Sequence, residues 1–142
     1  MKLSSIFLAT FCAIVLIAVL MLMLGVNVHR VPAHGAKLYD PGTEVTIKGE
    51  VAEVREIACP VSEGEIGSHL MLKTPEGVTQ VHLAAGRIVR SNKLSFSPGD
   101  QLTVIGSKVQ LLGRNDVIAR EILRGNEDFV LRDRSGNLML VQ

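Results

Sequence analysis

The chain of 142 residues has few aromatic side chains, with no tryptophan, one tyrosine and four phenylalanines. Only three of these five lie beyond residue 37, at Tyr39, Phe96 and Phe129. Residues 37–142 also lack a charge excess, because their 13 Lys and Arg stand against 14 Asp and Glu, a net charge of −1. Proteins that hold single-stranded nucleic acid stack bases on aromatic rings in a basic groove. This composition therefore disfavours nucleic acid as a partner, although single-strand binding remains an alternative to be tested.

Cysteine is equally scarce, with Cys12 and Cys59 as the two cysteines of the chain. Cys12 lies inside a long apolar run, so the two cannot pair within one chain and no disulfide framework is expected. The C-x-x-C spacing of many metal sites is absent too. Cys59 is then a small buried hydrophobe, a free thiol or a metal ligand.

Enzyme signatures are also missing. The sequence has no glycine-rich phosphate loop and no nucleophile elbow. Ser62 with Glu63 and Glu65 is more typical of a solvated loop than of an active site. We therefore predict that the protein is not an enzyme.

The N-terminal segment differs from the rest, because residues 6–26 carry no charge and only Thr10 interrupts their low polarity. This run is close to the ~20 residues that cross a bilayer as a helix. It exceeds the apolar region of a secretory signal, about 7–15 residues. We predict a transmembrane anchor at residues 1–28, a linker at 29–37 and a domain at 38–142. The protein would be a single-pass protein of a bacterial inner membrane, with its C-terminal domain in the periplasm. The alternative is a signal cleaved after Ala33.

Alternation of apolar residues predicts that residues 38–142 are all-β. The first strand slips phase between Val51 and Val54, as a β-bulge would cause. Gly106 marks a similar bend in a later strand. The expected elements are strands at 43–57, 69–73, 78–83, 102–111 and 117–123, a helix at 84–92 and a last hairpin turning at 133–136. One helix between the third and fourth strands favours an OB-fold-like small Greek-key barrel over a two-sheet sandwich.

Short sequences spread over residues 38–140 support this fold. They include Leu38-Tyr39-Asp40-Pro41, Ser68 to Thr74, Val81-His82-Leu83 and Ile118-Ala119-Arg120-Glu121-Ile122. Together they resemble a family of small exported bacterial proteins with OB-fold-like domains, most of which have no assigned activity. Members of that family often end in a Pro and a Trp, where this chain has Leu138 and Leu140.

The architecture is also loosely similar to membrane-tethered haem chaperones, which place an OB-fold behind one N-terminal helix. Their haem-attaching His-x-x-x-Tyr is absent, because Gly35 lies four residues before Tyr39, the only tyrosine. We therefore expect no covalent haem transfer of that type.

One constellation of residues has metal-binding chemistry. The apolar pattern of the second and third strands favours a register in which paired residue numbers sum to 151. His69 would then lie opposite His82, with Cβ atoms about 4.5–5.5 Å apart. Cys59 lies in the preceding loop, and two His with a Cys suit zinc or copper. Met71, on the same face, is a candidate fourth ligand. Alternatively, both histidines are solvent-facing positions of a half-buried hairpin, and Cys59 is an ordinary loop residue.

The sequence as a whole predicts a membrane-anchored, extracytoplasmic binding module that interacts with a protein partner or has a structural role. The alternative is a metal-binding or metal-delivery protein that uses Cys59, His69 and His82 to hold copper or zinc.

Overall fold

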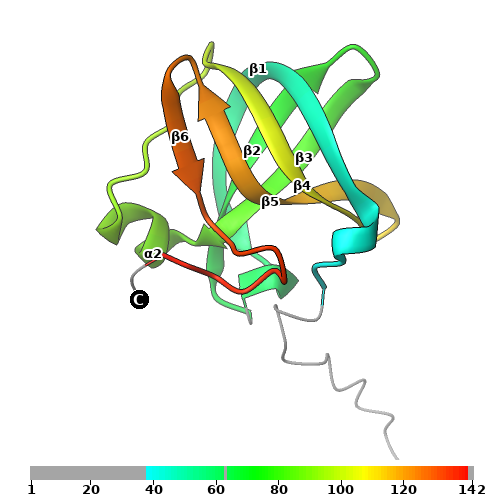
Figure 1. Cartoon of the computed structure of the whole chain (residues 1–142), viewed down its shortest axis with the longest axis vertical. Helices are drawn as coiled ribbons and strands as arrows, with labels where there is room; N and C mark the ends of the chain where they lie inside the picture. Colours follow the sequence, from blue (N-terminus) through cyan, green and yellow to red (C-terminus); the bar gives the residue numbers. More distant parts are fainter. Residues whose placement is uncertain (1–37, 63, 141–142) are drawn as a thin grey trace, which may run out of the picture. The chain divides into compact units, whose positions relative to one another are not determined.

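The computed structural model describes residues 38–62 and 64–140. The predicted anchor and linker lie outside the described residues. Within the described part, no helix is long and apolar enough to cross a membrane. The elements in chain order are η2 (Pro41–Thr43), β1 (Glu44–Ala58), η3 (Pro60–Ser62), β2 (Ile66–Thr74), β3 (Gly77–Ala85), α2 (Gly86–Ser91), β4 (Gln101–Leu111), β5 (Arg114–Arg124) and β6 (Glu127–Val130), as Figure 1 shows.

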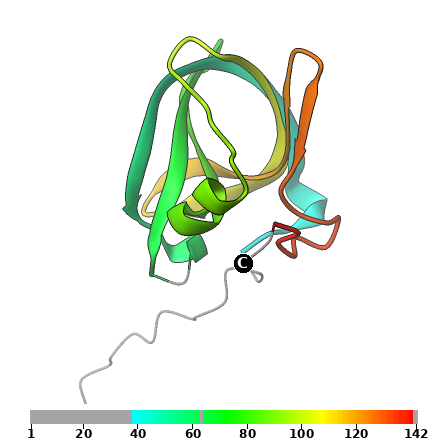
Figure 2. The ribbon, with the colours of Figure 1, turned by 90° about the vertical axis from the view of Figure 1, so that its left-hand side faces the viewer.

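The strands form one sheet that closes on itself. Its order is β3-β2-β1-β4-β5-β6, and β3 also pairs with β5 in parallel. Strands β1 to β5 therefore form a barrel, and β6 extends β5 outside the ring (Figure 2). The helix α2 connects β3 to β4. This is the small Greek-key barrel of an OB-fold, so the predicted fold class is confirmed for the domain, and the two-sheet alternative is wrong.

Bulges and close backbone contacts allow the long strands to curve. The first half of β1 pairs with β4 and its second half with β2, with a register shift between Val51 and Glu53. A second shift in the β4–β5 ladder lies between Ile105 and Gly106. Both predicted irregularities are confirmed. At Gly106 a Cβ atom would lie 2.2 Å from the Ile118 carbonyl oxygen, so only glycine fits this bend.

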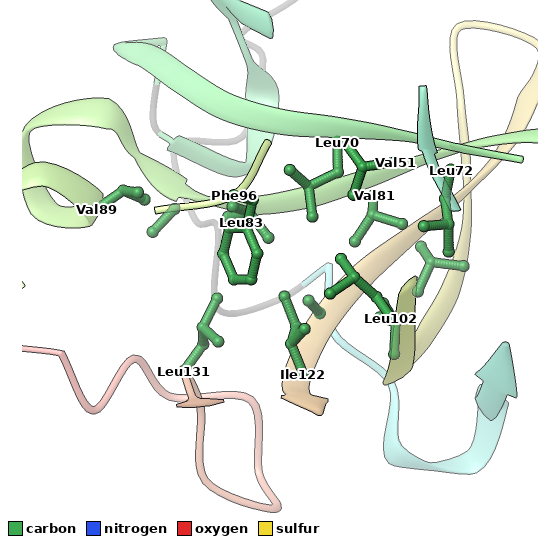
Figure 3. Close-up of a cluster of buried hydrophobic side chains, with 14 of the residues drawn as sticks. Val51, Leu70, Leu72, Val81, Leu83, Val89, Phe96, Leu102, Ile122 and Leu131 are labelled. Atoms are coloured by element: carbon green, nitrogen blue, oxygen red, sulfur yellow. The ribbon is translucent and has the colours of Figure 1, made fainter. Parts of the chain in front are cut away.

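The barrel interior holds the main hydrophobic core. Figure 3 shows Leu70, Val81 and Ile122 pointing into one cluster from β2, β3 and β5. All three are fully buried, and burying each such side chain contributes roughly 1.5–3 kcal/mol. The residues that alternate with Leu70 and Val81 must therefore project from the other face of the β2–β3 hairpin, and those residues include both histidines.

Two predicted elements differ from the structure. The helix begins at Gly86, because Ala84 and Ala85 still belong to β3. The last hairpin shrinks to an isolated bridge between Arg132 and Leu138, since β6 ends at Val130 and pairs with β5. The Asp133 carboxylate accepts backbone N–H bonds from Ser135 and Asn137, which favours a compact turn over two paired strands.

Candidate metal centre

The β2–β3 ladder brings the two histidines together. His69 pairs directly with His82, so the predicted register is confirmed. The ring centroids lie 4.6 Å apart with an interplanar angle of 81°, an edge-to-face arrangement. The nitrogen atoms of both rings are therefore close enough to serve one ligand.

The expectation that these histidines face solvent is wrong, because His69 is 1% exposed and His82 3%. The face of the hairpin away from the main core is covered by a second buried apolar cluster, formed by Tyr39, Cys59, Val61 and Ile118. His82 pairs with Ile118 across the parallel β3–β5 contact, next to this cluster. Burial here arises from the loop between β1 and β2 and from β5, which is distant from both histidines in sequence.

Cys59 is held in place by the tight loop that follows β1. Its backbone N–H donates to the Glu65 carbonyl, and its carbonyl accepts from the N–H groups of Ser62 and Gly64. The Cys59 Sγ lies 3.0 Å from His82 Nδ1. Ligand atoms of Cys59, His69 and His82 all lie within 4.8 Å of one another. The structure thus brings together all three residues that the sequence predicts as ligands.

Gly67 makes room for this arrangement. A Cβ atom at Gly67 would lie 2.8 Å from the Cys59 Cβ, 2.7 Å from the Ser62 Oγ and 3.1 Å from the His69 Cε1. Real Cβ atoms essentially never lie within 3.0 Å of another heavy atom, so the contacts with Cys59 and Ser62 would force a shift. The approach of the Cys59 loop to His69 therefore requires glycine at this position.

Asp116 completes the site, and sequence reasoning missed it. Its Oδ2 lies 2.8 Å from His82 Nε2, and its side chain is 2% exposed. A proton on Nε2 donates to the carboxylate and leaves the Nδ1 lone pair directed at Cys59. The only feature of the sequence that could have indicated Asp116 is a single carboxylate near the start of an apolar strand. Its contact with His82 follows from the β3–β5 pairing, which the sequence does not predict.

Burial keeps the imidazoles neutral. Desolvation lowers the pKa of His69 to about 4, and the nearby His82 adds to this effect. Desolvation also lowers the pKa of His82, although its bond to Asp116 opposes the shift. Neutral imidazole is the form that binds a metal ion, so neither ring must lose a proton at pH 7. Burial raises the pKa of the Cys59 thiol, so metal binding there would release a proton.

One ring nitrogen has no partner. The buried Nδ1 of His69 makes no hydrogen bond within the described residues. Leaving a buried polar atom unpaired costs about 1–3 kcal/mol. An unpaired ring nitrogen on a histidine of this cluster is available to bind a ligand. Met71 pairs with Gln80 two positions along the same ladder, and its role as a fourth ligand stays a prediction.

Arg132 adds a buried positive charge near the site. It is 6% exposed, and its Nη1 donates to the Ala119 carbonyl, next to Ile118 of the second cluster. Burial lowers its pKa to about 10, so it stays charged at pH 7. None of the ion pairs among the described residues includes Arg132.

Comparison with solved structures finds distant similarities in backbone arrangement. One is the S. pombe Stn1–Ten1 complex, at 18% identity and a TM-score of 0.44, covering 59% of this chain and 59% of that one. The chain thus spans less than two thirds of the Stn1–Ten1 chain that it matches. Another is OBody AM1L10 bound to hen egg-white lysozyme, at 17% identity and a TM-score of 0.44, covering 66% of this chain and 93% of that one.

No curated protein matches the chain. A family model does, over residues 43–129, a range that contains β1 to β5 and the four residues Cys59, His69, His82 and Asp116. This match covers more than half of the 142 residues. The chain belongs to the MamS/MamX magnetosome protein family.

Proposed function

We propose that this domain is a non-enzymatic binding module that holds one soft metal ion between Cys59, His69 and His82. The observation that carries the proposal is the meeting of three ligand atoms, from three separate places in the chain, within 4.8 Å of one another. All three side chains are buried, where a polar cluster without a ligand is costly.

The spacing of the donors fits a metal after small shifts of the side chains. Zn–S bonds are about 2.3 Å and Zn–N bonds about 2.0–2.1 Å, which separates ligand atoms of one tetrahedral ion by roughly 3.3–3.7 Å. The Cys59 Sγ and His82 Nδ1 atoms, now 3.0 Å apart, would move apart by about half an ångström, and a pair at the 4.8 Å limit would move closer by about 1–1.5 Å. Thiolate and imidazole donors together favour zinc or copper.

The bond between His82 and Asp116 supports the same function. Metal-binding histidines usually donate their other ring N–H to a carboxylate or a carbonyl, which fixes the ring and raises its basicity. Here Nε2 is 2.8 Å from the buried carboxylate, while Nδ1 faces Cys59. The ring is oriented for a metal before any ion is bound.

The remaining parts of the predicted setting are proposals of the same kind. The domain would be tethered by its N-terminal helix to a bacterial inner membrane and would face the periplasm. It would transfer its ion to a protein partner, or bind that partner in its metal-loaded form. The likeness to haem chaperones stays a prediction and is not needed for this function.

Titration of the full chain in mild detergent with Zn²⁺ and with Cu⁺ tests the proposal. We expect one tightly bound ion per chain in the wild type and loss of that binding in His82→Ala. His34→Ala, which removes a histidine of the predicted linker, is the matched control and should bind normally. Circular dichroism of each variant separates lost binding from lost folding. Absence of stoichiometric binding in the folded wild type would overturn the proposal.

A further inference from the structure

We propose that this centre selects cuprous copper over divalent zinc. The inference rests on the proposed function and specifies its metal. Its first support is the number of donors. Among the described residues, the cluster of potential His, Cys, Asp and Glu ligands contains three side chains. Structural zinc sites almost always have four protein ligands, whereas Cu⁺ is stable with three and is favoured by thiolate.

Asp116 does not supply the fourth ligand. Its Oδ2 is bonded to His82 Nε2, and Cys59 lies against Nδ1 on the other side of the same ring. An ion between Cys59 and Nδ1 is thus separated from the carboxylate by the imidazole. Asp116 is a positioning residue for His82, so without the Met71 thioether the ion has one sulfur and two nitrogens as its protein ligands.

Burial works against zinc with a water as its fourth ligand. The ligand side chains Cys59, His69 and His82 are at most 3% exposed. Catalytic zinc sites with three protein ligands keep an open position for water or substrate. A site enclosed by the Cys59 loop and by the second apolar cluster instead suits an ion that needs no water.

The buried charges favour a monovalent cation. With Cys59 as thiolate, the buried groups are two anions, Cys59 and Asp116, and one cation, Arg132, a sum of −1. Cu⁺ brings this sum to zero, whereas Zn²⁺ leaves a net positive charge in a region of low dielectric constant, which is costly. Arg114, 3.5 Å from Asp116, is 56% exposed, so water screens its charge and it is not counted among the buried groups.

The test is an anaerobic competition on the full chain in mild detergent. Cu⁺ is supplied in a colorimetric chelator, and Zn²⁺ is offered in tenfold excess. We expect the chain to withdraw one Cu⁺ and to retain it against zinc, with Cys59→Ser losing this ability. Displacement of copper by zinc, or binding of zinc alone, would overturn the inference and leave the proposed function standing. Failure to bind either ion would overturn both.

Two further measurements test the two reasons for copper selectivity, the number of donors and the buried charge. X-ray absorption at the copper edge of the loaded wild type should report three-coordinate Cu⁺ with one sulfur; a four-coordinate ion would contradict the argument from donor number. Arg132→Gln removes the buried charge but keeps an N–H donor for the Ala119 carbonyl. We expect it to raise the affinity for Zn²⁺ at least tenfold relative to Cu⁺. An unchanged ratio in a folded variant would contradict the argument from charge.

Discussion

His69 and His82 occupy directly opposed positions of the β2–β3 ladder, with their ring centroids 4.6 Å apart, and both are buried. Opposed positions of an antiparallel pair are its closest side-chain contacts. The hairpin therefore sets the distance between the two imidazoles, and the loop that carries Cys59 closes over them. The proposed metal centre would therefore be a property of the barrel and would require no separate binding domain.

Asp116→Asn should lower the affinity for the bound metal about 10–100-fold, because outer carboxylates orient the ligating histidine and raise its basicity. The affinity is measured by chelator competition on the full chain. Asp128→Asn, at an exposed position of β6, is the control and should bind as the wild type does. Equal affinities in the two variants would mean that Asp116 does not act through His82.

The metal-free protein should lose stability on acidification. Above pH 6.5, His69 is neutral in the folded and unfolded states alike. Between pH 6.5 and about pH 4 the unfolded state takes up a proton that the buried ring does not. The free energy of unfolding therefore decreases as the pH is lowered through this range. The total loss from His69 is about 3 kcal/mol, and His82 shifts in the same direction.

Denaturant unfolding between pH 7.5 and pH 4, with metal removed by chelator, checks this dependence. His69→Gln cannot take up that proton, so its stability should change less over the same range. A wild-type stability that does not depend on pH in this window would contradict the burial of neutral histidines.

Gly106→Ala should destabilise the barrel by about 1–3 kcal/mol or more, because the new Cβ would lie 2.2 Å from the backbone oxygen of Ile118. Backbone atoms cannot rotate away as a side chain can, so the β4–β5 ladder must shift. Thermal unfolding measures the loss, and Lys108→Ala, at an exposed position of the same strand, serves as the control. Similar melting temperatures for the two variants would mean that β4 tolerates a Cβ at its bend.

Gly67→Ala should affect the metal more than the fold. Its Cβ would collide with the Cys59 Cβ and the Ser62 Oγ, both in the loop, so we expect the loop to move outward. Removing the sulfur from reach should weaken metal binding at least tenfold while the far-ultraviolet circular dichroism stays that of the barrel. Metal affinity equal to that of the wild type would show that Cys59 is not a ligand.

Much of the barrel could be predicted from local patterns. The apolar residues Leu70, Leu72 and Val81, around the turn at Thr74–Gly77, favour the hairpin register, since a shift by one residue would turn these side chains away from the core. The phase slip near Val51 in turn predicts the bulge. The last hairpin was mispredicted, because alternation at Leu138 and Leu140 does not reveal that Asp133 caps a compact turn.

The site was predictable only in part, because it depends on contacts distant in sequence. The register of one hairpin places His69 opposite His82, and proximity in the chain suggests Cys59. Asp116 joins them through a parallel pairing of β3 with β5, which no local pattern indicates. The burial of both imidazoles depends on the Cys59 loop and on that same strand.

The most direct test of the metal centre is ¹⁵N nuclear magnetic resonance of the histidine side chains in the full chain, before and after one equivalent of Cu⁺ under anaerobic conditions. The chain has four histidines, so His29 and His34 are internal controls. Our account predicts that the ring nitrogens of His69 and His82 shift, while those of His29 and His34 do not. Shifts confined to His29 and His34, or no shift at any histidine, would contradict it.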